Sequence, residues 1–236
     1  GTFYARLVPK TCYLVLDGLF GSVAEPGGKD KAVEITVNGN VRTIEQPGVA
    51  RMPQPQIPEQ VVTAPDYSFF RNSCTCDLSG ILTRGINRVS IRTIGFVSHP
   101  EALPYPPAII GDFSVKKDAR GWVLDTTEQT FGYESWVKNG YPYYSGFGLY
   151  RHVFEVPSTF DRLILRFSRV TGSVDIALNG KRVDGFTWQP MELDVTKLCD
   201  AKRNELQVVT NNTVDNILRM NGRPSGILGE VYLDVY

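Results

Sequence analysis

Hydrophobic and polar residues alternate with a period of two along several short stretches of this chain. The clearest stretches are residues 13–16, 33–37, 89–93, 163–167, 174–178 and 206–209. They are rich in β-branched and aromatic residues and are bounded by Gly, Asn, Asp or Pro, which is typical of strands. No stretch of ten or more residues has the apolar period of an amphipathic helix. The pattern therefore predicts an all-β protein built of antiparallel β-sandwiches.

Parts of this pattern occur twice. The matching segments are 33–40 with 174–181, 77–91 with 194–208 and 3–9 with 151–157. The same spacing separates Asp77 from Asn87 and Asp194 from Asn204. Solenoid repeats are only about 20–50 residues long, so a repeat of this length indicates two copies of one domain.

Short turns are predicted at equivalent places in both copies. Asn38-Gly39 and Asn179-Gly180 each follow a strand. Asn-Gly supplies the two positive-φ residues of a type I′ turn, so both are expected to be tight hairpins. Asp77 and Asp194 are each expected to cap a single helical turn.

The repeat predicts two tandem domains, 1–115 and 116–236. The first is expected to close with a strand over 108–115, and the second to open with a strand at 122–124 and end with one over 229–236. The first copy has no counterpart to residues 116–148. It is therefore either abbreviated at its N-terminal side or cut from a longer protein.

The first copy carries an insertion, at about residues 46–65, that the second lacks. The insertion holds five prolines. Proline fixes φ and removes a backbone donor, so we expect an ordered or polyproline-like surface loop here. Loops of this length are uncommon without a role. It either covers a sandwich edge or contacts a ligand or a neighbouring domain.

The charge of the chain excludes some partners. Its 25 basic and 25 acidic residues cancel, and like charges form no block. Nucleic acids and anionic membranes normally require a clustered basic excess, so neither is expected as a partner. No run of apolar residues is long enough for a membrane span.

Catalytic and metal-binding motifs are missing from the sequence. The histidines are His99 and His152, and neither G-x-S-x-G nor H-E-x-x-H occurs. Cys74 and Cys76 stand too close for a zinc knuckle and are interpreted as small buried residues. The carboxylates show no spacing that marks a hydrolytic pair. We expect no catalytic residue, no metal and no cofactor in this chain.

One segment, residues 131–147, is unusually aromatic: seven of its seventeen residues are Phe, Tyr or Trp. Aromatic faces stack on the C–H faces of sugar rings, while neighbouring polar groups bind hydroxyls. The candidate carbohydrate-binding residues are Trp136, Tyr141, Tyr143, Tyr144 and Trp188. The alternative is that Trp136 and several of the tyrosines are core residues.

The second copy resembles a known family through several motifs. These are 140–146 (GYPYYSG) followed by Tyr150, the hairpin at Asn179-Gly180, Trp188-Gln189-Pro190, 193–195, 204–206 and 225–229. They are similar to the galactose-binding-like jelly rolls that serve as sugar-binding domains in the family 2, or β-galactosidase, superfamily of glycoside hydrolases. They also resemble C-terminal modules of α-L-rhamnosidase-type enzymes.

The resemblance implies a non-catalytic function. In such enzymes the catalytic carboxylates lie mostly in a separate barrel, and the accessory modules bind glycans or a structural calcium, or brace the catalytic domain. The sequence has no Asp-x-Asp loop for calcium. The implied partners are an oligo- or polysaccharide and a catalytic domain of the same parent protein. The implied location is extracellular or periplasmic.

Three functions stay open at this point. The first is a carbohydrate-binding pair of modules, and the second is a pure scaffold that docks a catalytic domain. The third is a jelly-roll polysaccharide lyase using Tyr150, Arg151 and His152. Alternation weakens the lyase hypothesis, because it sends Arg151 to the opposite face of the strand from the other two residues.

Overall fold

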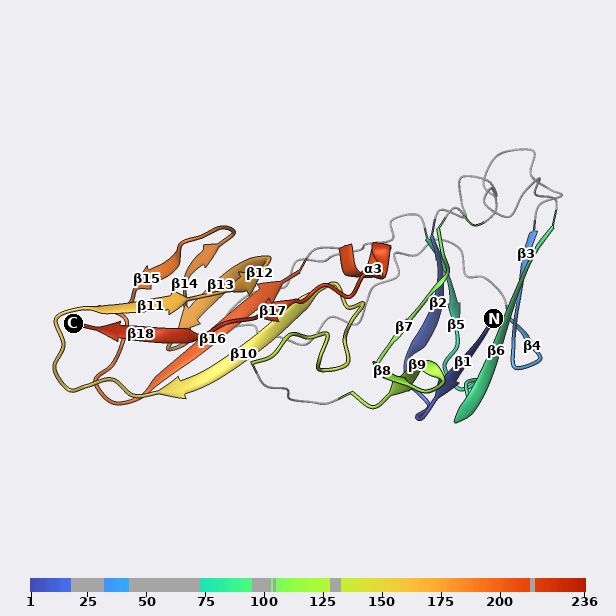
Figure 1. Ribbon diagram of the computed structural model, residues 1–236, viewed down its shortest axis with the longest axis horizontal. Helices are drawn as coiled ribbons and strands as arrows, with labels where there is room; N and C mark the ends of the chain where they lie inside the picture. Colours follow the sequence, from blue (N-terminus) through green and yellow to red (C-terminus); the bar gives the residue numbers. More distant parts are fainter. Residues whose placement is uncertain (18–31, 43–72, 95–102, 104, 128–132, 213–214) are drawn as a thin grey trace. The chain divides into compact units, whose positions relative to one another are not determined.

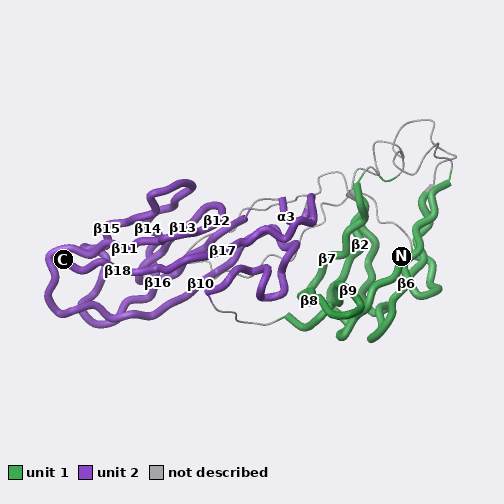
Figure 2. Tube along the Cα trace, in the orientation of Figure 1, with its two compact units in different colours: residues 1–53, 66–128 green, residues 54–65, 129–236 purple. Residues whose placement is uncertain are grey.

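The computed structural model confirms the predicted all-β fold class (Figure 1). It describes residues 1–17, 32–42, 73–94, 103, 105–127, 133–212 and 215–236. These residues divide into two compact units, each an arrangement of β-sheets (Figure 2). Unit 1 contains the described residues up to Thr127, and unit 2 those from Tyr133 onward. The predicted insertion at 46–65 lies outside the described residues.

Unit 2 is a sandwich of antiparallel sheets. One sheet has the strand order β10 (Phe147–Phe154), β16 (Asn204–Asn211), β13 (Ser173–Leu178) and β14 (Lys181–Phe186). The other has the order β15 (Met191–Asp194), β11 (Leu163–Phe167) and β18 (Val231–Val235). A short ribbon pairs β12 (Val170–Thr171) with β17 (Gly226–Ile227), and α3 (Asp215–Arg219) forms one helical turn. Alternate residues of the strands form the core, as in Leu163, Leu165 and Phe167 facing Val174 and Ile176.

Unit 1 has the same arrangement with one addition. Its smaller sheet has the order β5 (Ser73–Asp77), β2 (Cys12–Asp17) and β7 (Ala108–Gly111). Its larger sheet has the order β4 (Asn40–Arg42), β3 (Ala32–Val37), β6 (Gly85–Ile94), β1 (Thr2–Ala5), β9 (Gly121–Asp125) and β8 (Ser114–Asp118). Strands β1 to β7 therefore correspond in order to β10, β11, β13, β14, β15, β16 and β18 of unit 2. The six stretches of alternation all lie in strands, which confirms those predictions.

A buried contact between two asparagines explains why both units contain the same motif. In unit 1, Nδ2 of Asn38 donates to Oδ1 of Asn87 (2.9 Å), and Oδ1 of Asn38 accepts from the N–H of Arg88 (2.9 Å). In addition, the Asn87 side chain accepts from the N–H of Thr83 (2.9 Å) and donates to its carbonyl (2.8 Å). The contact ties the Asn-Gly hairpin to the start of β6.

Unit 2 contains the same contact, atom for atom. Nδ2 of Asn179 donates to Oδ1 of Asn204 (2.9 Å), and Oδ1 of Asn179 accepts from the N–H of Glu205 (2.9 Å). Asn204 accepts from the N–H of Asp200 (2.7 Å) and donates to its carbonyl (2.8 Å). Like Asn87, Asn204 is fully buried. We call these two contacts the asparagine clamps.

The predicted Asn-Gly hairpins are confirmed. Asn38 and Asn179 have φ values of 49° and 51°, and the following glycines have φ values of 84° and 75°. The capped turns at Asp77 and Asp194 are confirmed as well, although each is a single turn and not a longer helix. Each carboxylate accepts from the N–H two residues later, that of Ser79 (2.7 Å) and that of Thr196 (3.1 Å), as an N-cap does. The turns close through the N–H of Ile81 to the carbonyl of Leu78 (3.2 Å) and the N–H of Cys199 to the carbonyl of Val195 (3.1 Å).

The clamps also correct the alignment of the first strands. Asn87 pairs with Phe3, and Asn204 pairs with Phe154. The equivalent of Phe3 is therefore Phe154. The predicted match of 3–9 with 151–157 aligns Phe3 with Arg151, and that alignment is wrong. Both phenylalanines pack against the core of their unit, so burial and not sequence likeness sets the register.

The segment around residue 115 does not form a single closing strand. Residues 108–111 form β7 and residues 114–118 form β8, and these strands lie in different sheets. β8 and β9 form a hairpin on the edge of unit 1, where β9 pairs parallel with β1. The strand at 122–124, predicted to open the second domain, is thus part of unit 1. The described part of unit 1 therefore extends to Thr127, whereas the sequence predicts that the first domain ends at Val115.

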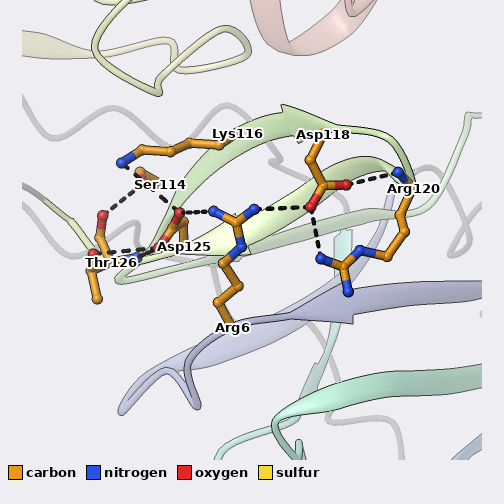
Figure 3. A network of polar contacts seen from close by, with 7 residues as sticks. All are labelled: Arg6, Ser114, Lys116, Asp118, Arg120, Asp125 and Thr126. Carbon is orange, nitrogen blue, oxygen red and sulfur yellow. Dashed lines mark hydrogen bonds and ion pairs between the residues drawn. The ribbon is translucent and has the colours of Figure 1, made fainter.

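An ion-pair network holds this hairpin against β1 (Figure 3). Arg6 follows β1, and its guanidinium lies between Asp125 on β9 (2.9 Å) and Asp118 on β8 (2.9 Å). Burial alone raises the pKa of Asp125, but the N–H of Thr126, the Arg6 guanidinium and Lys116 outweigh it and lower that pKa. Asp125 is 8% exposed, so its charge depends on these partners.

Two buried cysteines lie in the core of unit 1. Cys12 and Cys76 belong to the same hydrophobic cluster, which matches the interpretation of Cys76 as a small core residue. Burial raises the pKa of Cys12 to about 12. No helix in the described part of the chain is long and apolar enough to cross a membrane.

The clamps predict a specific loss of stability. Replacing Asn204 by Ala leaves the N–H of Asp200 and the amide of Asn179 without their buried acceptor. We expect the free energy of unfolding to fall by about 2–4 kcal/mol, measured by urea denaturation. Asn87→Ala should cost a similar amount, whereas the exposed Asn40→Ala should change stability by less than about 0.5 kcal/mol. Equal small effects for all three variants would contradict the importance of the clamps.

The Arg6 network predicts a pH-dependent effect. Arg6→Met keeps the aliphatic stem but leaves Asp125 without its guanidinium. Because the folded protein lowers the pKa of Asp125, the carboxylate stabilises the fold above about pH 4, and that contribution disappears as pH falls through the folded pKa. We expect wild type to be more stable than the variant at pH 7 and the difference to close in acid. Arg92→Met is the control, because it removes an exposed ion pair with Glu34. Its difference in stability from wild type should not close in acid.

Candidate functional site

A cleft of about 500 Å³ opens at the edge of the unit 2 sandwich where β10 and β16 face the chain from β17 to β18. Its lining residues are Tyr133, Tyr150, His152, Leu206, Val208, Ile227, Leu228, Gly229, Glu230 and Val231. Ligand sites typically occupy about 300–1,000 Å³ and combine an apolar lining with a few polar groups. This unit 2 cleft has both properties.

Strand alternation positions the β10 side of the cleft. Tyr150 and His152 pair with Val208 and Leu206 on β16, and all four side chains line the cleft. Arg151 lies between them in sequence and is exposed on the other face of the sheet. The structure therefore separates Arg151 from Tyr150 and His152, as alternation predicts for the residues of the lyase hypothesis.

The floor of the cleft is fixed by hydrogen bonds to one hydroxyl. Oη of Tyr150 accepts from the indole N–H of Trp136 (2.7 Å) and from the backbone N–H of Ile227 (3.2 Å). The indole fits because Gly148 and Gly226 lie against it. A Cβ on Gly148 would lie 2.4 Å from Trp136, and one on Gly226 would lie 2.4 Å from both Nε1 of Trp136 and Oη of Tyr150.

Polar and aromatic groups meet at the rim. The Tyr133 side chain is 56% exposed, and its hydroxyl lies 3.3 Å from Nδ1 of His152. The rings of Tyr133 and Tyr150 are nearly parallel, with their centroids 6.3 Å apart. On the opposite wall, Leu228 and Val231 supply apolar surface. The rim thus offers one accessible aromatic ring and groups that can both donate and accept hydrogen bonds.

A buried network holds the aromatic segment beside this cleft. The amide of Asn212 donates to the carbonyl of Tyr144 (2.7 Å) and to Oγ of Ser225 (2.9 Å), and it accepts from the N–H of Gly146 (2.8 Å). Asn216 donates to Oγ of Ser225 as well (3.0 Å). Oγ of Ser135 accepts from the N–H of Ser225 (3.2 Å). The GYPYYSG motif is therefore an ordered part of unit 2, anchored by polar residues that sequence reasoning did not identify.

Three of the candidate sugar-binding residues form one cluster in this segment. Trp136 and Tyr144 meet edge to face with centroids 5.5 Å apart, and Tyr141 meets Tyr144 at 6.3 Å. Trp136 is only 1% exposed, so it presents no face to a sugar and belongs to the core, the alternative considered for it. The hydroxyl of Tyr144 donates to the carbonyl of Phe147 (2.9 Å), and burial raises the pKa of this phenol. Tyr141 and Tyr143 are half-buried.

Trp188 lies apart from this cluster. It is 78% exposed, in the connection between β14 and β15. β14 and β10 are the two edge strands of the four-stranded sheet, three strand spacings apart, or about 14 Å. One ligand of monosaccharide size therefore does not contact both the unit 2 cleft and Trp188.

Unit 1 has a cleft of about 460 Å³ at the equivalent position. Its lining includes Val89, Ile91 and Pro107, the counterparts of Leu206, Val208 and Val231. Its lining side chains are apolar except for Thr2. Among the described lining residues, the histidine and the exposed tyrosine of the rim therefore occur in the unit 2 cleft alone.

The carboxylates of the smaller sheet of unit 2 are engaged in ion pairs. Arg162 pairs with Asp194 (3.0 Å), and Arg166 pairs with Glu192 and with Asp234. Hydrogen bonds from the hydroxyl and N–H of Thr196, and then from Arg162, lower the pKa of Asp194 to about 2. These groups brace the outer face of the sheet. Within the described residues, no group of three or more His, Cys, Asp or Glu is arranged to hold a metal ion.

Comparisons with known proteins gave matches among solved structures. No family model and no curated protein matches the chain. A rhamnosidase from Novosphingobium sp. PP1Y matches at 19% identity over 69% of this chain and 18% of its own, with a TM-score of 0.39. A β-glucuronidase from an uncultured Clostridium sp. matches at 28% identity over 45% and 16%, with a TM-score of 0.29. A Ruminococcus gnavus β-glucuronidase matches at 17% identity over 55% and 24%, with a TM-score of 0.34.

All three of these structures are of glycoside hydrolases, and the chain spans at most 24% of the length of any of them. Likenesses with TM-scores below 0.5 do not identify a site or an activity. The candidate site therefore depends on its own geometry.

The tight packing under the cleft leads to a testable prediction. Gly226→Ala places a methyl group against Trp136 and Tyr150 at a residue with φ of +95°, so we expect the free energy of unfolding to fall by about 3 kcal/mol. Gly180→Ala is the matched control, because its φ is also positive (+75°) but its Cβ meets open space. The control should lose only about 1–2 kcal/mol. Equal losses in urea denaturation would show that the Trp136–Tyr150 contact does not depend on Gly226.

Proposed function

We propose that this chain is a pair of galactose-binding-like β-sandwich modules, two copies of one fold, from a glycan-degrading glycoside hydrolase. We further propose that the second module binds carbohydrate in the unit 2 cleft. The single observation that carries the binding proposal is the combination in one cleft of an exposed tyrosine ring, a histidine and an apolar lining. The catalytic carboxylates are proposed to lie in another domain of the parent protein, outside the cytoplasm.

The cleft suits a pyranose for physical reasons. A sugar ring has apolar C–H faces and a periphery of hydroxyls, so it needs an aromatic platform surrounded by hydrogen-bonding groups. Tyr133 supplies the exposed ring, while its hydroxyl and the His152 ring supply polar groups within the same cleft. Leu206, Val208 and Val231 supply apolar surface, which a hydrophobic sugar face covers. A cleft of about 500 Å³ holds one or two sugar rings, within the usual range for ligand sites.

The experiment is a titration of the protein with methyl glycosides of glucose, galactose, rhamnose and N-acetylglucosamine, followed by amide NMR shifts. We expect at least one of them to shift the signals of Tyr150, His152 and Leu228. Tyr133→Ala should weaken that binding roughly fivefold or more, since an aromatic contact contributes about 1 kcal/mol. Tyr232→Ala, at an exposed tyrosine outside the cleft, is the matched control and should bind like wild type. Absence of shifts at the cleft with every sugar would refute carbohydrate binding there.

A second candidate function, bracing of the catalytic domain, is favoured by Trp188. An indole that is 78% exposed resembles the aromatic anchors of protein interfaces. Bracing and sugar binding use different residues, so Trp188→Ala separates them. The bracing role requires that this variant binds sugars normally but associates less tightly with the separately expressed catalytic domain. If Trp188→Ala weakens sugar binding instead, Trp188 is a sugar-binding residue, as the sequence suggested.

A further inference from the structure

We infer that the free edge of β10 in unit 2 pairs with the same edge of a second copy of this chain and forms a two-fold symmetric dimer. The two β10 strands run antiparallel in this dimer and join the four-stranded sheets of the two copies. The dimer is independent of the proposed function, because it uses the backbone edge of β10 and not the cleft.

The equivalent strand has different surroundings in the two units. In unit 1, β1 lies between β6 and β9, so both of its edges are paired. In unit 2, the equivalent strand β10 pairs only with β16 among the described strands and is the outer strand of its sheet (Figure 1). An unpaired edge presents a row of N–H and C=O groups, which is a template for pairing with another strand.

The hydroxyl of Tyr144 shows which backbone groups of β10 face this edge. It donates to the carbonyl of Phe147 (2.9 Å) and accepts from the N–H of the same residue (3.0 Å). The backbone groups of Phe147 therefore point away from β16, and by alternation so do those of Leu149, Arg151 and Val153. These last three residues make no backbone hydrogen bond on that side with any described residue. The aromatic segment thus covers the start of β10 and leaves its C-terminal half open.

The side chains along the open half carry complementary charges. Arg151 and Val153 are exposed, and so is Glu155, which follows β10 directly. Neither Arg151 nor Glu155 makes an ion pair within the described residues. Arg151 stands two residues before Val153, and Glu155 stands two residues after it. A two-fold axis at Val153 therefore places Arg151 of each copy opposite Glu155 of the other.

Charge favours this register over the alternatives. A two-fold axis at Arg151 would place the two arginines directly opposite each other, and like charges in that position are destabilising. An axis at His152 or at Phe154 would leave Arg151 opposite an uncharged residue. The axis at Val153 gives two ion pairs with a pair of valines between them, and opposite charges and β-branched residues are favourable cross-strand neighbours.

The dimer is expected to be weak, with a dissociation constant in the micromolar range. A shared edge of about five residues buries less surface than a standard protein interface. The measurement is sedimentation equilibrium of the chain at concentrations from roughly 1 µM to 1 mM, which spans such affinities. We expect the mass to rise from that of one chain to that of two. A single-chain mass at every concentration would overturn the inference.

A charge swap tests the register. Arg151→Glu and Glu155→Arg each place like charges opposite one another, so either change should weaken the dimer about tenfold. The double variant Arg151→Glu/Glu155→Arg restores opposite charges and should dimerise like wild type. Lys181→Glu is the matched control, because Lys181 is exposed on β14, the other edge strand of the same sheet. A double variant as weak as the single variants, or an equal loss in the control, would overturn the pairing at Val153.

A proline tests the backbone contribution separately from charge. Val153→Pro removes an N–H that points to the free edge, so the hydrogen bonds of β10 with β16 are kept. We expect this variant to remain folded, checked by urea denaturation, and to sediment as one chain at concentrations where wild type is dimeric. A folded Val153→Pro variant that dimerises like wild type would show that the dimer uses another surface, and the inference would be wrong.

Discussion

Both units depend on one buried contact, the hydrogen bonds between two asparagine side chains. In each clamp, the amide of the hairpin asparagine and the amide of a strand asparagine satisfy each other and the adjacent backbone groups. Asn87 and Asn204 have no exposed surface, so each of their polar atoms must find a partner inside the protein. The clamp fixes the position of the hairpin relative to the neighbouring strand. This position in turn sets which residues of each sheet face the core.

The units differ on the side of the larger sheet that lies away from the clamped hairpin, at β1 in unit 1 and at β10 in unit 2. In unit 1, β9 covers the edge strand β1, and Arg6 locks the added hairpin in place. In unit 2, the equivalent strand β10 is accompanied by the aromatic segment, whose Trp136 packs on Gly148. Both units retain a cleft between their sheets nearby, and among the described lining residues a histidine occurs in unit 2 alone. Common residues thus maintain the fold, and the proposed function uses residues that the copies do not share.

The sequence predicted the local structure of this protein better than its long-range contacts. Alternation located the strands, and Asn-Gly located the hairpins, because both signals come from residues adjacent in the chain. The pairing of β9 with β1 was not predicted, since it joins residues far apart and leaves no pattern in either strand. For the same reason the strand at 122–124 was predicted in the second domain.

The candidate site shows a similar limit. The aromatic composition of 131–147 pointed to a segment that borders the proposed cleft of unit 2, but composition cannot tell a buried ring from an exposed one. Trp136 is buried because two glycines make room for its indole, and Tyr133 is exposed at the rim.

The most direct test of the account is a crystal structure of the protein soaked with methyl β-glucopyranoside. The account predicts electron density for a pyranose ring in the unit 2 cleft, with a C–H face on Tyr133 and a hydroxyl within hydrogen-bonding distance of His152. Density for the sugar on Trp188, with only solvent in the cleft, would contradict it.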